Sequence, residues 1–453
     1  MRAVVVGGGI AGLAAARRLE SLAPDTKLVL LERDGTLGGK LRTEHADGFV
    51  IEAGADSFLS RKERGIGLCR ELRLDDDLIA RRPEHHRSFV RRGDDLHPLP
   101  EGLSGMIPTN LESLEESELL SPEGKARFAA EPEVPAARGH DDESVASFAT
   151  RRFGREAYEA LVEPLMTGIY GGDGEQLSLQ STFPQLQVVE REHGSLLRGL
   201  SAPPAGDLPP FLSLRDGVGA LVAALGADLA RTEIRVGREV TRVGPGYEVA
   251  VADGETLVAD GVVLATPAFA TAQIVEGLDE ELARAHEEIP YASSVVVTLA
   301  FSRADVVPLD GYGYVVPRVE RGDVLACTWS SQKWEGRAPD ESVLLRVYAG
   351  RFGGRDVTQD SDAELVRMAR DEVAFLGVAA DPELTRVHRW PLGMPQYVLG
   401  HPERLARIEG ALVAHPGLAL AGAAYRGVGI PDCIRSGELA AESVARALVG
   451  ARA

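Results

Sequence analysis

Residues 2–19 read RAVVVGGGIAGLAAARRL and carry the strongest structural signal in the chain. The apolar run at 3–6 predicts a buried strand, and the Ala- and Leu-rich residues 10–19 predict a helix. A second apolar strand is expected at 27–31, ending at Glu32. Strand, glycine turn, helix and strand within about 30 residues form a β-α-β unit. The unit predicts an α/β protein with a Rossmann-type domain.

The glycine turn at residues 7–12 matches the dinucleotide fingerprint G-x-G-x-x-G. Its glycines permit a tight turn, close approach of the backbone to a pyrophosphate, and close packing of helix on strand. The helix N-terminus directs its positive end at the phosphates. Glu32 follows Gly12 by twenty positions, where a carboxylate accepts hydrogen bonds from a ribose hydroxyl. The residues that this fingerprint predicts to bind the ADP half are Gly7, Gly9, Gly12 and Glu32.

A second glycine pair, Gly38-Gly39, follows Glu32 and precedes Lys40. It resembles the double-glycine motif of amine-oxidase-type flavoproteins, in which the backbone passes close to the cofactor. Lys40 can then meet phosphate or flavin oxygens. A plain NAD domain does not need this motif, so FAD is favoured.

A matching signal lies at the other end of the chain. Gly422 ends an apolar strand, and residues 427–430 lead into a helix near Asp432. The N-terminus of that helix can stabilise negative charge on the N1–O2 edge of a reduced flavin. Contacts at both chain ends are what an extended FAD molecule requires.

Composition restricts the other partners. The 453 residues suit two or three domains, and a hydrophobic content of 44% suits a globular protein with a buried core. A formal net charge of −20 disfavours nucleic acid and anionic lipid as bulk partners. The three cysteines lie far apart, which predicts neither a disulfide framework nor a metal site and fits a reducing cytoplasm. We expect no signal peptide and no membrane-spanning segment.

The middle of the chain is less regular. Residues 61–82 and 144–170 have helical patterns, residues 291–350 read as several strands, and residues 361–377 read as a helix. Residues 101–143 are rich in Glu, Ser, Pro and Ala, so we expect mobile or loosely packed structure there.

With these motifs the chain resembles, nearly end to end, the bacterial oxygen-dependent porphyrinogen oxidases of haem synthesis, the protoporphyrinogen and coproporphyrinogen III oxidase family. It looks most like the form of Gram-positive bacteria, whose substrate is coproporphyrinogen III. Ala55 departs from the family, which often has Pro there. The matching segments are GADSFL at 54–59, LHPLP at 96–100, EPLMTGIYGGD at 163–173, STFPQ at 181–185, LLRVY at 344–348, MPQY at 394–397 and GVGIPDC at 427–433.

The resemblance implies an amine-oxidase-type flavoprotein with three interleaved parts. These are an FAD-binding domain at 1–60, 215–290 and 385–453, a β-sheet substrate domain at 84–100, 175–214 and 291–384, and a helical region at 61–83 and 101–174 that in some members touches membrane. Val240 would meet the adenine through its backbone, and Trp390 would pack near the flavin. The further FAD contacts that it implies are Gly8, Ile10, Ala11, Arg33, Gly39, Lys40, Gly54, Ala55, Asp56, Ser57, Gly422, Val428, Gly429 and Ile430.

The resemblance also implies where the substrate binds. Ile169 and Tyr170 match a segment that lines the pocket, and the Gly168 carbonyl is a candidate acceptor for a pyrrole N–H. Tyr348 is a candidate pocket wall. Candidate anchors for carboxylates are Arg81, Arg82 and Arg87 in a local basic cluster, with Arg61 and Lys62 equally open.

The implied reaction is oxidation of coproporphyrinogen III, with dioxygen as acceptor and hydrogen peroxide as product. The flavin carries the chemistry, so no protein side chain is expected to be an obligatory base. Alternatives are protoporphyrinogen IX as substrate, another amine-oxidase-type flavoenzyme, or a flavoprotein that only delivers porphyrin to a ferrochelatase. The sequence leaves open a transient ferrochelatase contact, peripheral contact with the inner face of the cell membrane, and whether the protein is a monomer or a homodimer.

Overall fold

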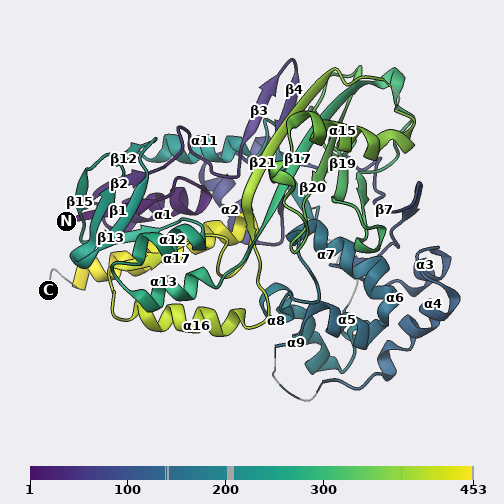
Figure 1. Cartoon of the computed structure of the whole chain (residues 1–453), viewed down its shortest axis with the longest axis horizontal. Coiled ribbons are helices and arrows are strands. Elements are labelled where there is room, and N and C mark those ends of the chain that lie inside the picture. Colours follow the sequence, from purple (N-terminus) through teal and green to yellow (C-terminus); the bar gives the residue numbers. More distant parts are fainter. Residues whose placement is uncertain (138, 140–141, 201–208, 379, 451–453) are drawn as a thin grey trace.

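The computed structural model describes residues 1–137, 139, 142–200, 209–378 and 380–450. Figure 1 shows three packed regions. A region built on a parallel sheet lies at the left with both termini, a large mixed sheet lies at the upper right, and a group of short helices lies at the lower right.

Five parallel strands form the centre of the first region, in the order β12-β2-β1-β16-β22. Strands β2, β1, β16 and β22 are mostly apolar and buried because other layers cover both faces of the sheet, whereas the edge strand β12 (TEIR) is largely polar and only partly buried. Val5 pairs in parallel with Leu30, and a helix connects their strands, which confirms the predicted β-α-β unit. The bounds are β1 (Arg2–Val6), β2 (Lys27–Leu31), β12 (Thr232–Arg235), β16 (Gly261–Leu264) and β22 (Leu418–Leu420).

Side chains that alternate along these strands enter two different cores. One face packs against helices α1 (Ile10–Leu22), α2 (Glu63–Glu71), α11 (Gly219–Asp228) and α17 (Ile430–Gly450). The other face packs against the small sheet β13 (Val240–Gly244), β14 (Glu248–Val251) and β15 (Thr256–Val258), and against α12 (Ala268–Val275), α13 (Glu280–Glu287) and α16 (His401–Leu412).

The two ends of the chain meet where α17 packs against α1. A Cβ atom added at Gly437 would lie 2.0 Å from the Ala11 carbonyl oxygen. Only glycine therefore allows the two helices to approach this closely.

We expect Gly437→Ala to lower the free energy of unfolding by about 2 kcal/mol, because overpacking forces the two helices apart. Thermal denaturation measures the effect. Gly410→Ala in α16 is the matched control, since its Cβ would meet no described atom within 4 Å. Equal melting temperatures for the two variants would contradict the prediction.

The second region is a seven-stranded sheet in the order β21-β17-β20-β19-β18-β7-β8. Helix α15 (Asp362–Val373) packs on one face of it. These elements confirm the predicted strands within 291–350 and the helix at 361–377. The strand bounds are β7 (Phe89–Arg92), β8 (Asp95–Pro98), β17 (Tyr291–Ser302), β18 (Gly313–Val315), β19 (Val324–Trp329), β20 (Ser342–Ala349) and β21 (Leu384–Pro395).

Short strands connect the regions. Strand β11 (Phe211–Leu214) lies between β5 (Phe58–Leu59) and β6 (Leu78–Ala80). The hairpins are β3 (Thr43–Ala46) with β4 (Phe49–Glu52), and β9 (Leu103–Ser104) with β10 (Ile107–Pro108).

The third region consists of short helices around a separate core. They are α3 (Leu111–Glu116), α4 (Pro122–Ala129), α5 (Val145–Phe153), α6 (Arg155–Ala157), α7 (Glu163–Tyr170), α8 (Leu179–Thr182), α9 (Pro184–His193) and α10 (Leu196–Gly199), with a π-helical segment at Tyr158–Val162.

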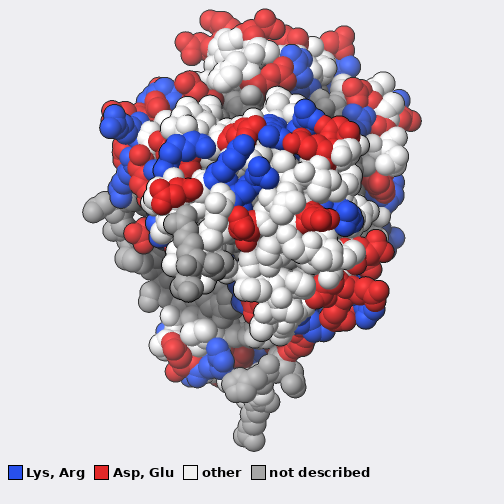
Figure 2. All heavy atoms as spheres, turned by 90° about the vertical axis from the view of Figure 1, so that its left-hand side faces the viewer, with Lys and Arg blue, Asp and Glu red and all other residues white. Residues whose placement is uncertain are grey.

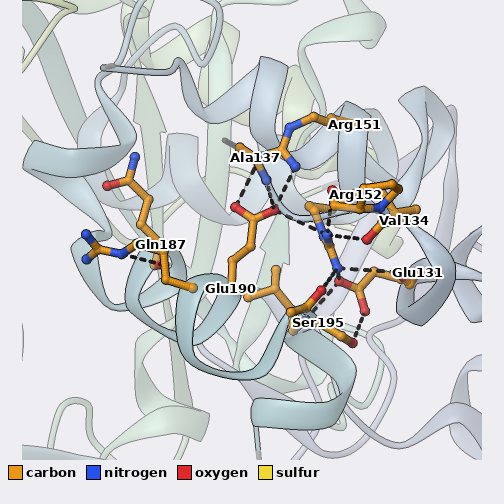
Figure 3. A network of polar contacts seen from close by, with 12 residues as sticks. Glu131, Val134, Ala137, Arg151, Arg152, Gln187, Glu190 and Ser195 are labelled. Carbon is orange, nitrogen blue, oxygen red and sulfur yellow. Dashed lines mark hydrogen bonds and ion pairs between the residues drawn. The ribbon is translucent and has the colours of Figure 1, made fainter. Parts of the chain in front are cut away.

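The expectation of loose packing at 101–143 is wrong for the described part of that segment. Phe128 is fully buried, and so is Glu131. Arg152 Nε donates to Glu131 Oε1 at 2.7 Å, and Ser195 Oγ donates to Glu131 Oε2 at 2.5 Å (Figure 3). Burial raises the pKa of Glu131, but the hydrogen bonds from Ser195, Leu196 and Arg152 outweigh it and lower the pKa overall. Glu131 thus connects this segment to α5 and to the residue that precedes α10.

Three of the predicted domain ranges also contain elements that pack in another region of the structure. Strand β21 belongs to the seven-stranded sheet, although residues 385–453 were assigned to the FAD-binding domain. Helices α8 to α10 pack in the helical core rather than in the substrate domain at 175–214. Helix α2 packs against α17, not with the helical region. Patterns of single elements do not reveal which distant segment they will contact.

Candidate functional site

The glycines of the turn at 7–12 meet two different requirements, close packing within the protein and open space for a ligand. A Cβ at Gly12 would lie 1.8 Å from the Gly7 carbonyl oxygen, and a Cβ at Gly7 would lie 2.7 Å from the Ala265 carbonyl oxygen. These two glycines are required by packing within the protein. A Cβ at Gly9 would meet no described atom within 4 Å, and Gly9 caps α1 without a side-chain hydrogen bond. Open space at a helix N-terminus fits a pyrophosphate. Ile10 and Ala11 form the first turn of this helix.

Glu32 stands where a ribose would be recognised. Its carboxylate accepts the backbone N–H of Gly8 at 2.6 Å and that of Asp34 at 2.7 Å. Both bonds orient the carboxylate beside the glycine turn, and a carboxylate can accept further hydrogen bonds from ribose hydroxyls. The predicted role of Glu32 fits this geometry.

Strand β13 begins next to Glu32. Arg238 donates its backbone N–H to the Glu32 carbonyl at 2.7 Å, and Val240 follows two residues later, buried. Arg33 extends its side chain to solvent, 65% exposed, beside Asp34. Figure 2 looks onto this end of the molecule and shows basic and acidic side chains intermixed over much of the face. Ion pairs such as Arg235–Glu255 (2.9 Å) account for part of this mixture.

The second glycine pair, Gly38-Gly39, packs against the glycine turn at 7–12. Gly38 donates its N–H to the Gly8 carbonyl at 2.8 Å, and a Cβ at Gly39 would lie 3.4 Å from Gly9 Cα. Lys40 donates a hydrogen bond to the Gly393 carbonyl. Desolvation lowers the pKa of Lys40 although its side chain retains solvent-accessible surface. The double-glycine motif and Lys40 thus border the open space at Gly9.

The C-terminal loop reaches the same region. Gly422 adopts a φ of 118° and donates its N–H to Ser436 Oγ at 3.0 Å, and a Cβ there would meet no described atom within 4 Å. Gly429 donates its N–H to Asp432 Oδ2 at 3.3 Å, and Lys62 Nζ lies 2.5 Å from the same oxygen. Val428 and Ile430 lie on either side of Gly429, at the start of α17.

Trp390 lies at the junction of the two regions. Its Nε1 donates to the Ala53 carbonyl at 2.8 Å. A Cβ at Gly54 would lie 2.5 Å from the Lys40 carbonyl oxygen and 3.8 Å from the Trp390 ring. The structure therefore brings together Lys40, Gly54 and Trp390, which are far apart in the sequence.

The carboxylate of Asp56 connects the segment at 54–57 to other parts of the chain. Its carboxylate is buried and accepts from Lys333 Nζ at 2.9 Å and Trp334 Nε1 at 3.1 Å, and Arg346 Nη1 lies at 3.6 Å. Burial raises the pKa of Asp56, but Lys333 and Arg346 outweigh it and hold the pKa well below its usual range. The side chain links the segment at 54–57 to the large sheet.

The neighbours of Asp56 complete this link. Ser57 donates to the Asp56 carboxylate at 2.7 Å, and Ala55 lies in the same turn, where the Gly54 carbonyl accepts from Arg346. Sequence reasoning missed Arg346 and Lys333. A charge inside the apolar run LLRVY at 344–348 was the available signal for Arg346.

The large sheet presents a second face away from α15. Trp390 pairs with Ser294 on β17, and Tyr348 pairs with Val296 on β17 and with Ala326 on β19. Ala326 in turn pairs with Val315 on β18. Residues directly opposite in a sheet share a face, so a continuous wall runs from Trp390 through Tyr348 to Val315. Trp390, Tyr348, Ala326 and Val315 each retain partial exposure.

Helix α7 lies over the far end of this wall. A Cβ at Gly168 would lie 3.5 Å from Val315 Cγ1, and Ile169 is 47% exposed. Within the described residues the Gly168 carbonyl accepts no hydrogen bond, because the helix ends at Tyr170. Tyr170, however, is buried and packs edge-on against Phe183 with ring centroids 5.8 Å apart. Tyr170 therefore lies on the core side of α7, whereas Ile169 faces solvent.

The arginines of the predicted anchor cluster have separate environments. Arg81 stacks on Phe211 and Tyr312, with its Cζ 5.2 and 4.7 Å from the ring centroids. No ion pair to Arg81 forms within the described ranges. Arg82 is paired with Glu84 at 2.7 Å, and Arg87 lies 3.7 Å from Asp310 with 56% of its side chain exposed. Arg61, the other open candidate besides Lys62, is exposed.

No group of three or more His, Cys, Asp or Glu side chains could hold a metal ion in the part of the chain that the structure describes. None of the helices within those residues combines the length and apolar character needed to cross a bilayer.

Comparison with known proteins agrees with this geometry. The family model of flavin containing amine oxidoreductases matches residues 10–445. The chain is 36% identical to coproporphyrinogen III oxidase of Bacillus subtilis, covering 96% of each chain. It is 32% identical to human protoporphyrinogen oxidase, covering 97% of this chain and 98% of that one.

Solved structures support the same conclusion. A crystal structure from Exiguobacterium, assigned provisionally as a protoporphyrinogen oxidase, superimposes with a TM-score of 0.89 at 34% identity and covers 98% of both chains. Cyclohexylamine oxidase from Brevibacterium oxydans shares the fold, with a TM-score of 0.70 at 19% identity. The predicted resemblance, fold class and FAD cofactor are confirmed. The chain belongs to the flavin containing amine oxidoreductases and, within them, to the porphyrinogen oxidase family.

Proposed function

We propose that this protein oxidises coproporphyrinogen III to coproporphyrin III, with dioxygen as electron acceptor and hydrogen peroxide as product. The relatives named coproporphyrinogen III oxidase support the substrate. One structural observation carries the proposal: the wall from Trp390 through Tyr348 to Val315 connects the cofactor-side residues with the free carbonyl of Gly168. A tetrapyrrole macrocycle suits such an apolar wall because its pyrrole rings and their alkyl groups are apolar.

Bound FAD supplies the redox chemistry by accepting hydride from a methylene bridge of the porphyrinogen. The protein orients the substrate and excludes water. In this proposal the sheet wall and Ile169 hold the macrocycle, and the Gly168 carbonyl accepts a hydrogen bond from a pyrrole N–H. Six electrons leave in three two-electron steps, and each step removes one hydride from carbon and one proton from a pyrrole nitrogen.

Aerobic turnover of both porphyrinogens by the purified yellow protein tests the proposal. We expect porphyrin fluorescence and peroxide to appear together, with kcat/KM about tenfold higher for coproporphyrinogen III than for protoporphyrinogen IX. A tenfold preference corresponds to about 1.4 kcal/mol, the scale of one charge-assisted hydrogen bond to an extra propionate.

Protoporphyrinogen IX is the second candidate substrate, supported by the similarity to the human enzyme. A reversed preference would select it. Turnover of neither porphyrinogen, with oxidation of an amine instead, would overturn both.

We expect Arg81→Gln and Arg87→Gln each to raise KM for coproporphyrinogen III by about threefold to tenfold with the FAD content unchanged. Their guanidinium groups make no hydrogen bond to a carboxylate within the described residues, so they are available for propionates. Arg82→Gln is the matched control, because Arg82 already donates to Glu84 at 2.8 Å. Steady-state kinetics measure the effect. Unchanged KM in both variants would reject the cluster as the anchor.

The proposal places the reaction in the cytoplasm. Sedimentation with vesicles tests whether the protein contacts the inner face of the cell membrane, and sedimentation with purified ferrochelatase tests a transient contact with that enzyme. Sedimentation of the protein alone distinguishes a monomer from a homodimer.

A further inference from the structure

We propose that Gln396 and Tyr397 are a pair of positioning residues, in which Gln396 holds the end of α7 and Tyr397 holds the loop before α17. Their significance for catalysis rests on the proposed function, since α7 carries the Gly168 carbonyl and the loop lies beside the cofactor. Neither side chain contacts the reacting atoms in this proposal.

Tyr397 is fully buried and uses its hydroxyl twice. The hydroxyl donates to the Ala423 carbonyl at 2.6 Å and accepts the N–H of Gly427 at 2.9 Å. Its ring stacks on His401, with centroids 4.3 Å apart and an interplanar angle of 13°. One hydroxyl therefore closes the loop between residues 423 and 427, whose glycine end adopts a φ of 130°.

Gln396 is also fully buried. Its Nε2 donates to the Tyr170 carbonyl at 2.8 Å, which satisfies a carbonyl that the last turn of α7 leaves free. The Tyr170 carbonyl lies two residues beyond Gly168. The position of the Gly168 carbonyl thus depends on a side chain from another region of the chain.

The backbone around these residues is held as well. Ser178 donates its N–H to the Tyr397 carbonyl at 2.8 Å, and Leu399 donates to the Gln176 carbonyl at 2.8 Å. Leu177 and Val398 form an antiparallel bridge. Val398 donates its N–H to the Gln396 carbonyl at 2.9 Å and closes a three-residue turn at Tyr397, just beyond the end of β21. From this turn Gln396 reaches α7 and Tyr397 reaches the C-terminal loop.

Together the two side chains fix the separation between α7 and the loop before α17. Catalysis of hydride transfer requires the donor and acceptor to be held in a narrow range of geometry, and a displacement of about 1 Å can cost about 100-fold in rate. Gln396 and Tyr397 are buried neighbours, and their hydrogen bonds to α7 and to the loop at 423–427 restrict the movement of one relative to the other.

The test compares Gln396→Leu and Tyr397→Phe in the full-length holoenzyme by amide hydrogen exchange. We expect Gln396→Leu to speed exchange about tenfold in 163–172 but not in 423–433, and Tyr397→Phe to do the reverse. Tyr247→Phe is the matched control, because its hydroxyl accepts the Gly417 N–H at 2.9 Å at the start of β22. It should leave exchange in both segments unchanged. Gln396→Met replaces the leucine variant if that one does not fold.

Two further measurements separate the roles. Tyr397→Phe should weaken FAD binding about tenfold, measured by flavin fluorescence on dilution, while Gln396→Leu should leave it unchanged. Gln396→Leu should instead raise KM for coproporphyrinogen III about tenfold. Equal exchange in wild type and both variants would overturn the positioning roles even if the enzyme oxidises porphyrinogen. The expected exchange pattern in a protein that oxidises no porphyrinogen would overturn the proposed function and leave the positioning roles standing.

Discussion

Gly9→Val is expected to give a folded but colourless protein. A Cβ at this position would meet no described protein atom within 4 Å, and the backbone of Gly9 (φ −72°, ψ 176°) suits any residue. A valine would therefore cost little within the protein but would collide with the pyrophosphate of FAD. A steric cost of about 3 kcal/mol corresponds to roughly 100-fold weaker binding.

Flavin absorbance of the purified protein and circular dichroism of the same sample measure the two parts of this prediction. Gly410→Val in α16 is the control, since its Cβ would also meet no described atom within 4 Å. It should remain yellow. A Gly9→Val protein with wild-type affinity for FAD would show that the pyrophosphate does not approach this turn.

Asp56→Asn is expected to lower the free energy of unfolding by about 3–5 kcal/mol at neutral pH. The substitution keeps the shape of the side chain but leaves the buried Arg346 and the partly buried Lys333 without the negative charge that neutralises them. Loss of one partner from a buried ion pair is costly because the remaining charge stays desolvated. Urea denaturation measures the difference. Asp228→Asn is the matched control, since its ion pair with Arg17 (2.7 Å) is exposed and should contribute less than about 1 kcal/mol.

The same carboxylate predicts a dependence on pH. Its pKa is lower in the folded protein than in the unfolded chain, because Lys333 and Arg346 favour the charged form. The stabilisation is therefore complete above the unfolded pKa of about 3.9 and is lost as the pH falls below it. The difference in stability between wild type and Asp56→Asn should shrink below about pH 4. A constant difference down to pH 2 would show that the charge of Asp56 is not responsible.

Much of the cofactor site was predictable because its signals are local. The turn at 7–12, Glu32 and the double-glycine pair are each recognised from a few neighbouring residues, and the structure brings them together around Gly9. The C-terminal glycine loop was recognised in the same way. The orientation of Tyr170 was not predictable, since Ile169 and Tyr170 are adjacent and only the packing of α7 determines which one is exposed.

The amino-acid sequence alone was sufficient for the Rossmann unit, the flavin motif and the family, because glycine φ angles, apolar strands and helix starts are properties of short segments. The folded arrangement was needed for the partners of Asp56, the contact of Gly437 with α1, the wall from Trp390 to Val315, and the assignment of β21 to the large sheet. Each of these depends on the register and packing of segments tens to hundreds of residues apart, and a local pattern carries no information about which distant surface will cover it.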